Sequence, residues 1–145
     1  MNILAAVDLS PASEKVIEAA RGVAELTGAS IYVFHVVESD PDIVGDDADH
    51  ELQRNRIAAD FPREDQQLQA LEEKLLDQGV DATRWLVRGP AIKTTLKESA
   101  RLNAGLIVVG SHGHGAVWDV LIGSYSAAII RKSGLPTLVV PILDT

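Results

Sequence analysis

Short apolar runs alternate along the chain with longer stretches in which apolar residues recur at helical spacing. The short runs predict five strands, at residues 3–7, 30–37, 83–88, 106–109 and 137–140. The intervening spacing of three and four residues predicts helices at about 11–27, 64–78, 91–103 and 124–132. Residues 38–62 are acidic and irregular, so we predict a loop there that contains a short helix at about 50–59.

The first predicted helix carries both a start and a stop signal. Ser10 offers a hydroxyl cap, and Pro11 is suited to the first helical position. Gly28 follows the last apolar position and is typical of a helix end. The sequence therefore predicts a helix that begins at Pro11 and ends before Gly28.

Strands alternate with helices through the chain, and this order predicts a parallel sheet with right-handed crossovers. We therefore expect an α/β fold of three layers, in which a doubly wound, Rossmann-like sheet of five parallel strands has helices on both faces. No linker or internal repeat divides residues 1–145, which are expected to form one domain. Ligands bind such sheets beyond the carboxyl ends of the strands. The strand ends that qualify are Asp8, Val36 with Val37, and Gly110.

Composition agrees with this fold and narrows the class of partner. Aromatic residues make up only 4% of the chain, so aliphatic side chains must build the core, which favours parallel strands covered by helices. The net charge of −8 argues against nucleic acid and anionic membranes as partners. A nucleotide remains compatible, because a pocket of backbone N–H groups can hold phosphate in an acidic protein.

The ends and the cysteine content also exclude some classes. The chain has no cysteine, which rules out disulfides and thiolate chemistry. The amino terminus lacks a basic region and reaches Asp8 early, so we expect no signal peptide there, and no apolar run is long enough to span a membrane. We therefore expect a cytoplasmic protein.

A glycine-rich loop follows the fourth predicted strand. Its glycines are Gly110, Gly113, Gly115 and Gly123. Glycine lets the backbone approach a ligand closely, and such a loop can turn several N–H groups toward one anion. The helix that begins at Ser124 adds unpaired N–H donors and the positive end of its dipole. These residues suit a polyphosphate, and a flexible loop with a helix cap at Ser124 is the alternative.

Two common phosphate-binding motifs do not match this loop. The P-loop requires a Gly-Lys pair, which the sequence lacks. The dinucleotide fingerprint G-x-G-x-x-G fails because Trp118 stands where the third glycine belongs after Gly113 and Gly115. The loop must therefore be interpreted by its own spacing.

That spacing, Gly-2x-Gly-9x-Gly-Ser from Gly110 to Ser124, is similar to the signature of ATP-binding universal stress proteins. The chain resembles that family over essentially all of its length. The further matches, in order, are residues 6–10 (Ala-Val-Asp-Leu-Ser), His35 with Val36, Gly89 with Pro90, and residues 136–140 (Pro-Thr-Leu-Val-Val). The resemblance implies the adenine nucleotide alpha hydrolase-like form of the α/β fold.

The resemblance also implies which residues hold the nucleotide. Asp8 corresponds to the aspartate that contacts the nucleoside, and the backbone of Val36 corresponds to the strand end that holds adenine. The residues that would bind ribose and phosphates are Gly110, Gly113, Gly123 and Ser124. Gly115 of the same loop is a further candidate, as is Tyr125, whose ring would crowd the phosphates or stack near them. Pro90 directly after Gly89 departs from the family pattern and would alter the adenine-side wall.

What the resemblance implies for function is a regulatory module of the stress response that binds ATP and changes its surface on binding. Mg²⁺ or Mn²⁺ is a candidate to bridge the phosphates. A homodimer paired along the C-terminal strand is also implied. Two alternatives stay open: a slow ATP hydrolase in which Asp8 or His112 orients water, and a nucleotide-free dimeric scaffold. The serines show no nucleophile–base–orienter pattern, so we assign no catalytic residue.

Other patterns do not support a protein-held metal. His112 and His114 lack a third ligand in the sequence, and we interpret them as polar loop residues that line or flank the phosphates. Residues 40–51 partly match a calcium loop, but Val44 occupies a position that requires an oxygen ligand. We therefore predict a solvated acidic loop there and assign no metal ligand.

Overall fold

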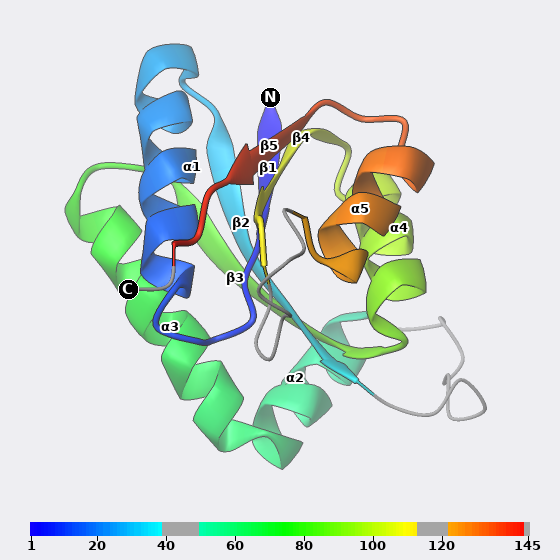
Figure 1. The fold of residues 1–145 in the computed structure, drawn as a ribbon. Helices are drawn as coiled ribbons and strands as arrows, with labels where there is room; N and C mark the ends of the chain where they lie inside the picture. Colours follow the sequence, from blue (N-terminus) through cyan, green and yellow to red (C-terminus); the bar gives the residue numbers. More distant parts are fainter. Residues whose placement is uncertain (39–49, 113–121, 144–145) are drawn as a thin grey trace.

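The computed structural model describes residues 1–38, 50–112 and 122–143 (Figure 1). The strands are β1 Asn2–Ala6, β2 Ser30–Glu38, β3 Ala82–Gly89, β4 Ala104–Gly110 and β5 Thr137–Val140. The helices are α1 Ser13–Thr27, α2 His50–Asp60, α3 Pro62–Asp77, α4 Ala91–Arg101 and α5 Ser124–Lys132. Strands and helices therefore alternate as predicted, and α2 is the short helix predicted at about 50–59 between β2 and α3.

The five strands form one sheet in the order β3-β2-β1-β4-β5, and every neighbouring pair is parallel. Along the central strand, Ala5 pairs with Val33 on one side and with Val108 on the other. The chain winds outward from β1 to β3 and then returns to the other side of β1 for β4 and β5. The carboxyl ends of β1, β2 and β4 therefore meet where the strand order reverses, which is the position that binds ligands in doubly wound sheets.

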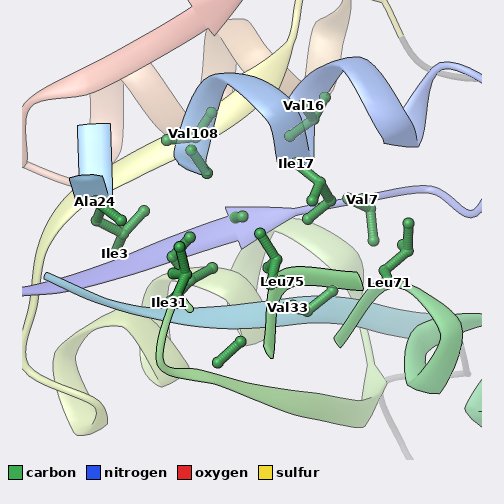
Figure 2. Packing of buried hydrophobic residues seen from close by; sticks show 14 of the residues in the cluster. Ile3, Val7, Val16, Ile17, Ala24, Ile31, Val33, Leu71, Leu75 and Val108 are labelled. Carbon is green, nitrogen blue, oxygen red and sulfur yellow. The ribbon is translucent and has the colours of Figure 1, made fainter. Parts of the chain in front are cut away.

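Both faces of the sheet are buried, because helices cover each of them. Successive side chains of a strand point to opposite faces, and in β1 they enter two different cores. Ile3 and Ala5 pack on the side of α1 and α3, where Leu75 is fully buried (Figure 2). Leu4 packs with Ile129 of α5 in the second core. The layers in Figure 1 follow this division, which confirms the predicted three-layer architecture.

The predicted elements are present, and their bounds differ from the predicted ones by at most two residues. α5 and β5 have the predicted bounds, and β4 begins two residues before the predicted run. α1 begins at Ser13 and not at Pro11, because the Asp8 carboxylate organises the preceding residues into a turn. Its Oδ1 accepts hydrogen bonds from the Ser10 N–H at 3.0 Å and the Ser13 hydroxyl at 3.3 Å. Gly28 ends the helix in the left-handed conformation, as predicted.

α2 lies against β3 through an aromatic contact. The Arg54 guanidinium carbon is 3.8 Å from the centroid of the Trp85 ring, a distance at which a cation is attracted to the ring face. The Trp85 ring also meets Tyr32 edge-on, with centroids 5.4 Å apart, and its Nε1 donates to Glu98 at 3.3 Å. Trp85 is therefore a packing residue. Trp118 and residues 40–49 of the rejected calcium loop lie outside the described residues.

Candidate functional site

A pocket of about 870 Å³ opens at the carboxyl ends of β1, β2 and β4. This volume is within the range of small-molecule sites. Of the residues predicted from the sequence to bind a ligand, the pocket is lined by Asp8, Val36, Gly110, Gly123, Ser124 and Tyr125. Gly113 and Gly115 lie outside the described residues, as does His114. The fold thus brings together residues that are more than a hundred positions apart in sequence.

Asp8 stands directly after β1 and its carboxylate is held by the turn that precedes α1. The two hydrogen bonds from Ser10 and Ser13 restrict its rotation. Leu9 has a positive φ of 64°, an uncommon conformation for a residue with a side chain, and the turn around it directs the chain into α1. The carboxylate is exposed, so it is accessible at the mouth of the pocket. Its orientation therefore depends on the serines of the turn.

The amino terminus of α5 forms the opposite side of the pocket. Gly123 is the cap residue, with φ −67° and ψ 163°, and Ser124 is the first helical residue. Such a terminus presents backbone N–H groups and the positive end of the helix dipole. The Ser126 hydroxyl donates to the Gly110 carbonyl at 2.6 Å, which holds the helix against the end of β4. This side of the pocket therefore suits an anion.

Ser111 joins the two ends of the glycine loop to the end of β5, a role that the sequence did not reveal. Its carbonyl accepts the N–H of Gly123 at 2.6 Å, and its own N–H donates to Val140 at 2.8 Å. Its hydroxyl oxygen accepts the N–H of Ile142 at 2.9 Å and lies 2.9 Å from Nδ1 of His112. Ser111 is buried, so these bonds are shielded from water. The phosphate side of the pocket is therefore held by residues from three separate segments.

Tyr125 lines the pocket, but its hydroxyl is engaged on the neighbouring helix. It lies 2.7 Å from the Oγ1 of Thr95, which itself donates to the Ala91 carbonyl. Thr95 has one hydroxyl hydrogen, so Tyr125 must be the donor in their bond. The ring packs in the core between α4 and α5. Its hydroxyl is therefore committed to the fold, and the predicted place of the ring beside the phosphates stays a prediction.

Replacing Tyr125 with phenylalanine is expected to flatten the loss of stability at high pH. Burial raises the pKa of Tyr125 to about 12 from the usual 10. Between pH 10 and 12 the unfolded chain releases this proton before the folded one, so the wild type loses roughly 2 kcal/mol over that interval. Below pH 10 the variant should be less stable by about 1 kcal/mol, because it lacks the hydrogen bond.

Urea unfolding at pH 8, 10, 11 and 12 measures both effects, and these conditions span the expected transition of a tyrosine. Tyr32→Phe provides the matched control, because Tyr32 is only half-buried and Thr95 bonds to Tyr125 instead. Equal slopes of stability against pH for the wild type and the Tyr125 variant would contradict the assignment.

Two further residues clarify the nucleoside side of the pocket. Pro90, whose position after Gly89 suggested an altered wall, caps α4 and does not line this pocket, although Ala91 does. His35 lines the pocket, and its Nδ1 lies 2.7 Å from the Val7 carbonyl on the neighbouring strand. In the sequence, His35 stood out only through the family resemblance, because a contact between two strands does not change the sequence pattern of either strand.

The described ranges contain neither a cluster of metal-ligating side chains nor a helix that could span a membrane. Within them, no group of three or more His, Cys, Asp or Glu side chains is arranged to hold a metal ion. No helix in the same ranges is long and apolar enough to cross a membrane.

Known proteins and solved structures resemble this chain over nearly all of its length. A family model described as the universal stress protein family matches residues 1–141. Universal stress protein A homolog 1 of Coxiella burnetii is 35% identical over 140 residues, covering 96% of this chain and 94% of that protein. Among solved structures, universal stress protein UspA from Lactobacillus plantarum matches with a TM-score of 0.77 and 18% identity, covering 97% of each chain. The universal stress protein from Archaeoglobus fulgidus in complex with dAMP matches with a TM-score of 0.70 and 22% identity, also over 97% of each chain.

The structural matches show the fold, which is the adenine nucleotide alpha hydrolase-like arrangement expected from the sequence. The family match extends from the first strand through the last, and it includes the signature glycines and Ser124. The family model and the curated relative agree over nearly the full chain, and on these grounds the protein belongs to the universal stress protein family.

Proposed function

We propose that this protein binds ATP in the pocket at the carboxyl edge of the sheet and acts as a nucleotide-dependent regulatory module of the stress response. The observation that carries the proposal is the convergence of Asp8, Val36, Gly110 and the Gly123 end of α5 on one pocket. Carboxylate and strand-end backbone groups suit a nucleoside, and helix N–H groups suit phosphate. The dAMP in the related Archaeoglobus structure supports an adenine nucleotide as the ligand class.

Charge supports one orientation of the nucleotide. Glu38 at the end of β2 and Glu64 in the first turn of α3 line the pocket together with Asp8. Gly110 and α5 lie on the other side of β1 in the sheet order. Three carboxylates repel phosphate, whereas a helix amino terminus attracts it. The nucleoside therefore lies toward β2 and the phosphates lie toward α5.

A divalent cation fits this proposal only as a bridge between phosphates. Mg²⁺ is usually held by one or two carboxylates and by substrate phosphates, and it retains several waters. Asp8 follows β1, the strand next to β4 on the phosphate side, and no three-residue ligand group exists in the described ranges. Mg²⁺ or Mn²⁺ would supply charge neutralisation of the phosphates, and Asp8 would reach it through water.

The proposed regulatory role needs two things. The first is a conformational equilibrium that ATP can shift, and the second is a sheet edge that can pair with another chain. ATP that binds one arrangement of residues 110–124 more tightly than others shifts the population toward it. β5 is an edge strand of the sheet, and Leu138 on it is exposed. Unpaired strand edges favour pairing with another chain, so we propose a cytoplasmic homodimer joined along β5. The ligand side and the pairing edge are linked through Ser111.

Two measurements on the purified protein test the proposal. Mass spectrometry of the supernatant from heated protein should find an adenine nucleotide, or millimolar ATP should raise the melting temperature. At a hundred times the dissociation constant, the stabilisation should be about 2.7 kcal/mol. If neither signal is observed, the ATP-binding proposal is defeated and the nucleotide-free scaffold remains. Sedimentation would then verify the dimer of that scaffold. Release of phosphate in a single turnover would instead support the slow hydrolase.

A further inference from the structure

His35 is fixed by a hydrogen bond that determines its tautomer. It lies on β2, and its Nδ1 is 2.7 Å from the carbonyl oxygen of Val7, the residue that follows β1. A carbonyl oxygen can only accept, so Nδ1 must carry the hydrogen of the bond. A neutral imidazole has one such hydrogen. The other ring nitrogen, Nε2, is therefore a hydrogen-bond acceptor when the ring is neutral.

That acceptor has no partner within the described part of the protein. The only hydrogen bond of the His35 ring there is the one to Val7, and His35 is one of the residues that line the pocket. The ring is half-buried. A polar atom in such a position gains most from a ligand that brings a donor, since it is otherwise paired only with water.

The position of His35 selects the part of the ligand that supplies the donor. The ring is tethered to the residue before Asp8, and His35 itself precedes Val36. It thus stands between the two residues proposed to contact the nucleoside. Phosphate oxygens are acceptors at neutral pH, so a phosphate facing a bare Nε2 would be repelled. A nucleoside offers ribose hydroxyls and the exocyclic amine of adenine as donors.

We infer that Nε2 of His35 accepts a hydrogen bond from a hydroxyl or amino group of the bound nucleoside, and so helps to determine which nucleotides bind. This inference rests on the proposed ATP-binding function. It assigns to His35 two separate tasks, with Nδ1 positioning the end of β1 and Nε2 contacting the ligand. The two ring nitrogens can be removed separately by substitution, which makes the tasks distinguishable.

His35→Asn and His35→Gln separate the two nitrogens. The asparagine amide nitrogen takes about the position of Nδ1 and can still donate to the Val7 carbonyl. No atom of asparagine replaces Nε2. Glutamine extends its amide to about the reach of Nε2 and offers an acceptor there, while it loses the donor to Val7. We expect His35→Asn to weaken ATP binding about 3- to 10-fold by calorimetry, and we expect His35→Gln to weaken it less. Ser30→Ala on the same strand, away from the pocket, is the control and should bind like the wild type.

Nucleotide analogues identify the donor. The four nucleotides are ATP and three analogues that each lack one of its donor groups: 2′-deoxy-ATP, 3′-deoxy-ATP and purine riboside triphosphate. For the analogue that lacks the group contacted by His35, the ratio of dissociation constants of the Asn variant and the wild type should fall to about one. The same ratio for all four nucleotides, or no loss of ATP affinity in the Asn variant, would overturn the inference while ATP binding itself stands.

A spectroscopic readout does not depend on any variant. Two-bond ¹H–¹⁵N correlation spectra of the wild type with labelled histidine at about pH 8 report which nitrogen carries the hydrogen. We expect the Nδ1–H tautomer for His35 without ligand and a shift of the Nε2 signal when ATP is added. An Nε2–H tautomer would overturn the inference. A wild type that binds none of the four nucleotides would refute the ATP-binding function, and the contact with it.

Discussion

Replacing Gly123 with valine is expected to abolish the stabilisation that ATP gives the wild type, about 2.7 kcal/mol at a hundred times the dissociation constant. Gly123 lines the pocket and caps α5 in a conformation, φ −67° and ψ 163°, that residues with side chains adopt readily. The backbone therefore tolerates the change. The valine side chain would stand at the helix amino terminus where a phosphate must approach the N–H groups.

Thermal shift with and without millimolar ATP measures the effect. Gly22→Val is the matched control, because Gly22 lies inside α1 and a Cβ added there has no atom within 4 Å. The control should keep the full ATP shift, with an unliganded stability close to that of the wild type, since valine and glycine differ by only a few tenths of a kcal/mol in helix propensity. An undiminished shift in the Gly123 variant would place the phosphates elsewhere.

Replacing Phe34 with alanine is expected to produce the largest loss of stability, about 3–5 kcal/mol. Phe34 is fully buried on β2, in the core that faces α4 and α5. Its partner on β1 is Ala6, which is too small to fill the space that the ring would leave. Natural domains are stable by only about 5–15 kcal/mol, so this one change removes a large part of the total.

Urea unfolding followed by circular dichroism gives the free energy of unfolding for this variant. Tyr32→Ala is the matched control, because Tyr32 lies on the same strand and the same face but is only half-buried. Its edge-on contact with Trp85 predicts a smaller loss, about 1–2 kcal/mol. A Phe34 variant that costs no more than the Tyr32 variant would mean that the core closes around the missing ring.

The elements of this fold could be predicted because its strands and helices each leave a local pattern. β5 is a run of four apolar residues between two prolines, and α5 begins after a glycine and ends before another, so both have the predicted bounds. The approximate location of the pocket followed from the topology, since parallel strands bring their carboxyl ends to one edge. The start of α1 did not follow, because the bonds from Ser10 and Ser13 to Asp8 depend on three-dimensional geometry.

The missed parts of the site have a common physical cause. Ser111 acts through its backbone and a buried hydroxyl on residues 12 to 31 positions away. His35 acts on a carbonyl 28 positions away. Neither contact changes the composition or the period of the surrounding sequence. Tyr125 was predicted near the phosphates because its neighbour Ser124 is a signature residue. It does line the pocket, and the bond of its hydroxyl to Thr95 of α4 was the part that the sequence did not reveal.

The bonds of Ser111 also decide where this protein can be altered in the laboratory. Its hydroxyl receives the N–H of Ile142, so proteolysis or a stop codon after Val140 would remove a support of the ligand pocket as well as the end of the chain. Met1 precedes β1, at the amino-terminal ends of the strands, whereas the pocket lies at their carboxyl ends. An affinity tag or fluorescent reporter for the experiments above therefore belongs at the amino terminus.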